Sequence, residues 1–114
     1  MIPSDLSRRH CESCEGIGSA LTSEQISPLL HQLDKGWVVS ADHRAIEKSF
    51  SFKQFYETMA FVNALAWIAH RENHHPDLEL GYNYCRVRFM THALNGLSHN
   101  DFISAAKIDS IVKT

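Results

Sequence analysis

Histidines are concentrated in one part of this chain. Four of its eight histidines, His70, His74, His75 and His92, lie within 23 consecutive residues. Imidazole, with an unperturbed pKa of about 6.5, is the side chain best suited to give and take protons near neutral pH. Taken singly, each residue could be an ordinary surface or core histidine. Their grouping predicts either proton transfer or metal binding.

The metal alternative depends on a pair of histidines four residues apart, a common zinc-ligand arrangement on a helix. In His70-Arg71-Glu72-Asn73-His74 the glutamate stands one position later than the His-Glu-x-x-His motif requires. No third ligand is evident beside the pair. We therefore expect no metal and assign these histidines to acid–base chemistry.

The longest predicted helix should carry most of the cluster. It begins at a capping box of Ser51 and Gln54 and continues to about Asn73, because Pro76 biases the preceding residue out of the helical region. Its apolar sector is wider than one sheet face needs, so part of it is expected to contact another subunit. Two stripes form this sector: Phe52, Phe55, Met59, Val62, Ala66 and Ala69, and Phe61, Leu65 and Ile68.

On this helix His70 and His74 would face the same side, being four residues apart. His75 would follow at the carboxyl end, where the helix dipole favours a protonated imidazole. His92 would arrive from the end of the last strand. The expected meeting place of His74, His75 and His92 is a mouth beside the sheet.

Two further helices are expected near the ends of the chain. The first begins either at a Thr22–Gln25 capping box or at Ser27, which would place Pro28 in the first turn and avoid losing a hydrogen bond. The second begins at a Ser98 cap. Its inner side is predicted to carry Phe102, Ala105, Ile108 and Val112.

Alternating residues predict two hairpins. One joins residues 37–39 to 44–50, and the other joins residues 78–82 to 85–89 with its turn near Tyr82 and Asn83. The order α-β-β-α-β-β-α predicts an α+β fold, a single-layer four-stranded antiparallel sheet covered on one face by helices. On the exposed face, Arg86 and Arg88 are interpreted as a solvated surface rather than an anion site.

The 114 residues suffice for one domain, with residues 1–20 expected to form an irregular N-terminal tail and residues 21–114 the folded unit.

A net charge of −2 argues against direct nucleic-acid binding. Residues 60–69 are too few to span a bilayer. Three cysteines and no secretory pattern suggest a cytoplasmic protein. Cys11 and Cys14 are a weak candidate for half a zinc site or a redox pair.

A longer pattern carries a resemblance. His70-x-x-x-His74-His75-Pro76, then Tyr82, His92 and Asp101 at intervals of five, nine and eight residues, resembles the signature of the pterin-4a-carbinolamine dehydratase family. The sequence around these positions is also similar to that of the family, including Asp77-Leu78-Glu79 and Arg86-Val87-Arg88-Phe89. The resemblance covers about residues 21–112.

The resemblance implies a hydro-lyase acting on 4a-hydroxytetrahydrobiopterin or a related pterin, without a cofactor, in the recycling of tetrahydrobiopterin for aromatic hydroxylation. His74, His75 and His92 match the family's active-site histidines. We assign His75 and His92 to proton transfer and His74 to binding the pterin and its hydroxyl. Proton delivery to the departing hydroxyl and removal from ring nitrogen N5 are the two transfers required.

Four positions have weaker assignments. Asp101 could orient a histidine or, three residues after Ser98, simply stabilise the helix start. His70 is a supporting candidate. Pro76 and Tyr82 are candidate substrate contacts by their place in the motif, although Pro76 is better explained as a helix terminator and Tyr82 could be a turn or wall residue.

The resemblance also implies other roles. Animal members act as dimerisation cofactors for a homeodomain transcription factor, which makes a protein-binding coactivator the alternative function. A pterin site serving molybdopterin metabolism is a further alternative. A homodimer or homotetramer is expected, because a small antiparallel sheet leaves an edge strand to cover.

Overall fold

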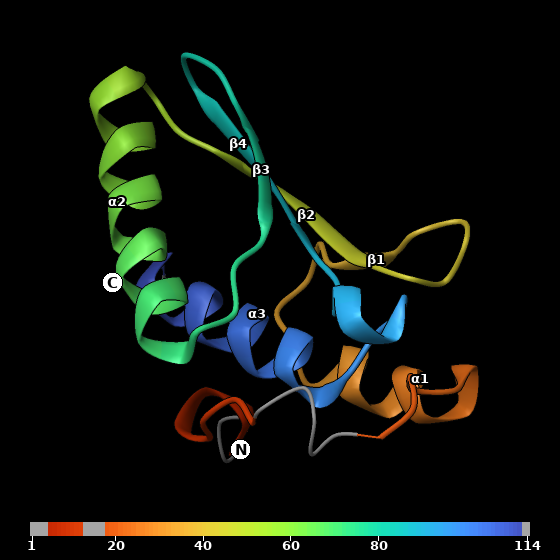
Figure 1. Cartoon of the computed structure of the whole chain (residues 1–114). Coiled ribbons are helices and arrows are strands. Elements are labelled where there is room, and N and C mark those ends of the chain that lie inside the picture. The colour runs from red at the N-terminus through yellow and green to blue at the C-terminus, as the bar shows by residue number, and fades with distance from the viewer. Residues whose placement is uncertain (1–4, 13–17, 113–114) are drawn as a thin grey trace.

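The computed structural model describes residues 5–12 and 18–112, and its centre is a four-stranded antiparallel sheet in the order β1-β2-β4-β3. Helices α2 and α3 lie on the same side of this sheet (Figure 1). The predicted element order and fold class are confirmed. The elements are α1 (Ser23–His31), β1 (Val38–Val39), β2 (Ile46–Ser51), α2 (Phe55–Glu72), β3 (Asp77–Leu80), β4 (Tyr84–Phe89) and α3 (His99–Val112).

Alternation along β4 separates the two faces of the sheet. Cys85, Val87 and Phe89 are buried beneath the helices. Arg86 and Arg88 point outward, where both bind the carboxylate of Glu47 on β2, at 3.0 and 2.7 Å. The hydrogen bond from Arg88 and the nearby Arg86 lower the pKa of Glu47. The two arginines therefore pair with a carboxylate on the neighbouring strand. This agrees with their interpretation as a solvated sheet face rather than an anion site.

Helix starts agree with the sequence at two of three positions. Thr22 caps α1 in a complete capping box with Gln25, so Pro28 lies inside the helix. Ser98 caps α3 through its hydroxyl, which accepts from the Asn100 N–H at 3.2 Å. The Ser51 cap predicted for α2 is wrong. Ser51 extends β2, and Gln54 caps the helix by accepting from the Tyr56 amide at 2.8 Å.

The wide apolar sector of α2 is only partly covered. Phe61 and Leu65 of this sector are buried, whereas Phe55 is 43% exposed. Trp67, which lies outside the two predicted stripes, is 61% exposed. Val112, predicted to face inward, is also exposed. Within the described residues, no helix is both long and apolar enough to cross a bilayer.

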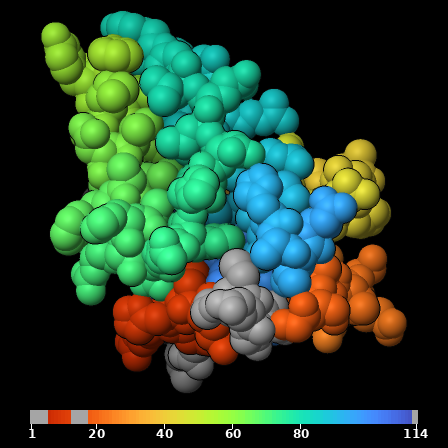
Figure 2. All heavy atoms as spheres, in the orientation of Figure 1, coloured from red at the N-terminus to blue at the C-terminus, as the bar shows by residue number. Residues whose placement is uncertain are grey.

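Part of the segment expected to be an irregular tail packs against the folded unit. Residues Asp5–Arg8 form a 3-10 helix, η1, that packs against α3, with Leu6 buried in the core. Lys107 of α3 donates to the Ser7 carbonyl at 2.8 Å. In Figure 2 this segment, in red, lies directly beneath the green end of α2. A single leucine among polar residues carries no periodic signal, so the packing could not be predicted.

A buried ion pair holds the carboxyl half of α3 to the sheet. Lys48 of β2 lies 3.0 Å from the Asp109 carboxylate, and both side chains are nearly buried. Asp109 also accepts from the Trp37 indole N–H and the Asp34 amide, each at 3.0 Å. The Lys48 ammonium lies 4.7 Å from the centre of the Phe50 ring. These contacts leave the ammonium dependent on one carboxylate for charge compensation.

Replacing Asp109 with asparagine should destabilise the fold by about 3 kcal/mol, because it leaves a buried ammonium without its counter-charge. The neighbouring Glu47→Gln, which breaks pairs on the solvated face of the same strand, should cost under about 1 kcal/mol. Urea unfolding measures both. Equal losses in the two variants would contradict the importance given to the buried pair.

Candidate active site

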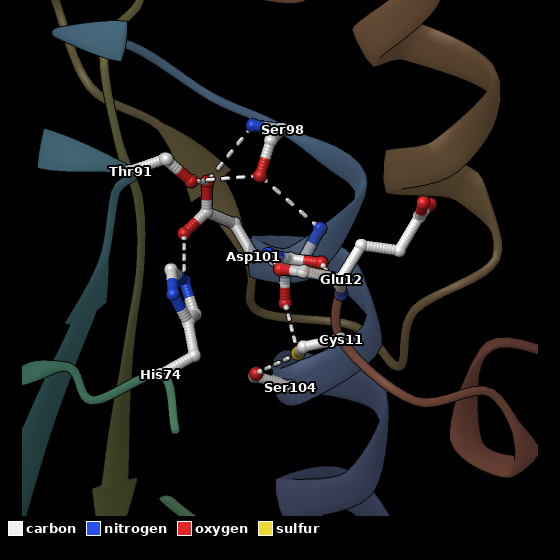
Figure 3. A network of polar contacts seen from close by, with 8 residues as sticks. Cys11, Glu12, His74, Thr91, Ser98, Asp101 and Ser104 are labelled. Carbon is white, nitrogen blue, oxygen red and sulfur yellow. Dashed lines mark hydrogen bonds and ion pairs between the residues drawn. The ribbon is translucent and has the colours of Figure 1, made fainter. Parts of the chain in front are cut away.

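The carboxylate of Asp101 is the fixed point of the site. The residue has no solvent exposure, and its Oδ1 lies 2.7 Å from Nε2 of His74. Its Oδ2 accepts from the Thr91 hydroxyl and the Ser98 amide, both at 2.9 Å. Figure 3 shows His74, Thr91 and Ser98 converging on this carboxylate. Because a carboxylate oxygen accepts hydrogen bonds, the His74 Nε2 that faces Oδ1 is the donor, and we assign the ring proton to it.

Asp101 makes the contacts that each of the two roles considered from the sequence would require. Its bond to the Ser98 amide is the return bond of a capping box, while the Ser98 hydroxyl accepts from the Asn100 amide two residues later rather than from the amide of Asp101. Its other oxygen holds a histidine 27 residues away. One side chain therefore bonds both the start of α3 and an imidazole.

His74 reaches this carboxylate because α2 ends before it. Asn73 adopts a left-handed conformation, φ 53°, and the His74 amide returns to the Ala69 carbonyl. His74 lies beyond the helix, so the helical relation predicted for His70 and His74 does not hold, although both residues line one hollow. The His74 ring is buried and stacked on Phe89, with the ring centres 5.9 Å apart.

His92 is positioned by the same carboxylate through its neighbour. Thr91, which donates to Asp101, also exchanges backbone hydrogen bonds with Gly96 and accepts from the Ser98 hydroxyl at 2.7 Å. A short 3-10 turn, η3 (His92–Leu94), follows directly. His92 consequently stands at the end of β4, as predicted.

The three histidines line one hollow of about 180 Å³, together with Asn73, Met90, Thr91 and Ala93. His75 and His92 are exposed there, and neither ring has a hydrogen-bond partner among residues 5–12 and 18–112. A second hollow, of about 360 Å³, shares Asn73, His74 and His75 with the first. The shared wall therefore divides two adjoining spaces, one of which falls in the size range typical of small-molecule sites.

The remaining predicted residues are divided between these places. His70 and Pro76 line the second hollow, and the His70 ring lies near Trp67. Tyr82 is 64% exposed at the β3–β4 turn and lines neither hollow, so the structure does not bring it to the histidines.

A larger hollow, about 500 Å³, lies between α2 and the end of α3 and has one titratable lining residue, Glu57.

No group of three potential ligands among the described residues is arranged to hold a metal ion.

Cys11 lies part-buried against the start of α3, its thiol 3.5 Å from the Ser104 hydroxyl. Burial raises the pKa of Cys11 to about 11, so its thiol stays neutral. Cys14 lies outside the described residues, and the pairing of the two cysteines stays a hypothesis.

Sequence reasoning missed three residues that build the site. Thr91 had one available signal, its position next to His92. Asn73 had another, because asparagine favours the left-handed conformation that ends a helix. Met90 had no such signal, because a methionine near the end of a strand usually belongs to the core and does not indicate a site.

Comparison with known proteins agrees with the resemblance. The family model described as pterin 4 alpha carbinolamine dehydratase matches residues 19–111. Two bacterial relatives are named after pterin-4-alpha-carbinolamine dehydratase. One, from Legionella pneumophila (strain Corby), is 73% identical and covers 97% of this chain and 98% of its own length. The other, from Nitrosomonas europaea, is 54% identical and covers 96% of both chains.

Solved structures extend this agreement to the fold. The crystal structure of a transcriptional coactivator/pterin dehydratase from Brucella melitensis has a TM-score of 0.77 and 33% identity, covering 82% of this chain and 98% of that one. A pterin dehydratase-like protein identified as a RuBisCO assembly factor in the alpha-carboxysome shares the fold, with a TM-score of 0.60, 22% identity, and coverage of 69% and 92%. On the family match and these identities, the chain belongs to the pterin 4 alpha carbinolamine dehydratase family, a family of hydro-lyases.

Proposed function

We propose that this chain dehydrates 4a-hydroxytetrahydrobiopterin or a closely related pterin carbinolamine to the quinonoid dihydropterin, in tetrahydrobiopterin recycling. The observation that supports this most directly is the single hollow lined by His74, His75 and His92. Family membership supplies the substrate class. A hollow of this kind, lined by three imidazoles, supports their assignment as groups that contact and protonate a small ligand.

In the proposed reaction His75 and His92 transfer the protons. One imidazole takes the proton from N5 of the pterin, while the other, as imidazolium, protonates the hydroxyl on C4a. The C4a–O bond breaks, the N5 electron pair forms the C4a=N5 double bond, and water leaves. After a proton passes between the imidazoles through solvent, the enzyme returns to its starting state.

His74 takes the binding role in this proposal. Its Nε2 is engaged by Asp101 and its ring is buried against Phe89. A proton held in that way is poorly placed for repeated exchange with solvent. Its Nδ1 is the nitrogen left to accept a hydrogen bond from the substrate, for instance from the C4a hydroxyl. Pro76 and His70, which line the adjoining hollow, are the proposed contacts for the rest of the ligand.

Replacing His75 with alanine should lower kcat by roughly 10² to 10⁴-fold, the usual contribution of one general acid or base. Stopped-flow measurement of carbinolamine dehydration tests this. His31→Ala, on the exposed end of α1, is the matched control and should leave the rate unchanged. A wild-type rate equal to that of buffer alone would reject the enzymatic proposal.

A chelator should leave the wild-type rate unchanged, and metal analysis of the purified chain should find no bound zinc.

Replacing Asp101 with asparagine should lower kcat by roughly 10²-fold, because the amide can donate to His74 Nε2 and so favours the other tautomer. The same assay measures the effect. Thermal unfolding must show that the variant still folds, since Asp101 also stabilises the start of α3. A folded Asp101→Asn with the wild-type rate would exclude the orienting role.

We also propose that the chain forms a homodimer or homotetramer. β3 lies at the sheet edge with all four residues exposed, and α2 leaves Phe55, Tyr56 and Trp67 at the surface. Pairing of either surface would remove unpaired strand edge or apolar area from water. The same aromatic residues would serve a protein-binding role, the second candidate function, which the Brucella melitensis protein's name supports.

Light scattering coupled to size-exclusion chromatography at micromolar concentration should give the mass of a dimer or a tetramer. The physical reason is the exposed edge of β3 together with the uncovered apolar residues of α2. A monomer under these conditions would contradict self-association through either surface.

A further inference from the structure

The N-terminal strap, residues 5–12, crosses between two elements that carry the site. Its 3-10 helix rests on α3, and its last residues run between the final residue of α2 and the first turn of α3. Figure 3 shows Cys11 and Glu12 beside the start of α3, close to Asp101. The family model begins at residue 19, so this strap lies outside the segment that the model matches.

The strap is fastened to α2 by Glu72. The Glu72 side chain is only 5% exposed, and its carboxylate accepts from the Cys11 amide at 2.7 Å and lies 2.9 Å from Nδ1 of His10. The same carboxylate lies 3.9 Å from the Lys107 ammonium of α3. Burial alone would raise the pKa of Glu72, but the bonds from Cys11 and His10 outweigh it, and the net pKa is lowered. The glutamate that did not fit a zinc motif therefore binds the chain's own N-terminal segment.

The strap is fastened to α3 by Asn100. This side chain is buried, accepts from the Glu12 amide at 2.9 Å and donates to the Glu12 carbonyl at 2.7 Å. The Cys11 thiol adds a longer contact to the Asn100 carbonyl, 3.6 Å. A buried amide that bonds both polar groups of one residue fixes the position of that backbone closely.

These two attachments adjoin the two partners of the central hydrogen bond. Glu72 precedes His74 by two residues, and Asn100 directly precedes Asp101. The intervening Asn73 is a tight left-handed turn, so the end of α2 transmits its position to His74 over a short span. The strap therefore links the two backbones whose separation sets the 2.7 Å contact between His74 and Asp101.

We propose that residues 5–12 position the His74–Asp101 pair, with Glu72 and Asn100 as positioning residues that touch neither substrate nor the reacting atoms. This inference rests on the proposed function for its kinetic consequence alone. Its structural consequence, a change at the His74 imidazole when the strap is released, holds whatever the chain catalyses.

The test uses two variants. Asn100→Leu keeps the side-chain size but removes both bonds to Glu12. Glu72→Ala releases Cys11 and His10, and it also removes the 3.9 Å contact of Glu72 with Lys107 of α3. Glu72→Ala should leave α2 itself intact, because a carboxylate at the carboxyl end of a helix opposes the helix dipole. It therefore tests the strap even if Asn100→Leu fails to fold. Asp109→Asn is the control, since it weakens α3 from its other end without touching the strap.

Two measurements are made on each folded variant. The ¹H–¹⁵N resonance of the His74 Nε2 proton reports its bond to Asp101, and steady-state kinetics separate kcat from KM. Release of the strap should move the resonance and lower kcat about ten-fold or more, with KM changed much less. Asp109→Asn should leave both unchanged below its unfolding temperature.

A wild-type resonance and a wild-type kcat in both strap variants would overturn the inference. If the wild-type chain does not dehydrate a pterin carbinolamine, the proposed function fails and the resonance alone decides. A shift confined to the strap variants then still supports positioning, and its absence still refutes it.

Discussion

The site depends on one buried carboxylate. Asp101 is withdrawn from water completely, and an ionised group in such a place must be compensated by donors. It receives them from His74, Thr91 and Ser98, which come from the end of α2, the end of β4 and the start of α3. Because the carboxylate requires all three donors, three separate parts of the chain are drawn together. His75 and His92 are adjacent in sequence to two of those donors and are brought to one hollow as a result.

The far end of α3 repeats this arrangement with different chemistry. Asp109 collects the Trp37 indole, the Asp34 amide and the Lys48 ammonium, joining the helix to the first hairpin. The two carboxylates are eight residues apart on one helix, so α3 is fastened at both ends. A single-layer sheet has only one core, and a helix held in this way keeps that core closed while the opposite face meets water.

The sequence predicted the fold well where the signal was local. The alternation of Cys85, Val87 and Phe89 identified β4, and the Ser98-x-x-Asp101 frame identified the start of α3. Predictions failed where tertiary contacts decided. Ser51 has the residue type of a cap but is recruited as a strand residue by pairing with Tyr84. The i, i+4 relation of His70 and His74 assumed a helix that Asn73 in fact ends. The Asp101–His74 bond joins residues 27 positions apart, and no local pattern could distinguish it from capping alone.

The unequal burial of the three imidazoles has a consequence for small molecules in solution. His75 and His92 stand at an open mouth, where free imidazole or another small buffer acid of similar size can enter the space left by a deleted ring. His74 also borders the hollows but is mostly buried between Phe89 and Asp101, so a solute in its place would have to reproduce both the ring stacking and the bond to the carboxylate. If the two exposed rings act as proposed, an external base of imidazole's size is expected to substitute for them more readily than for the buried ring.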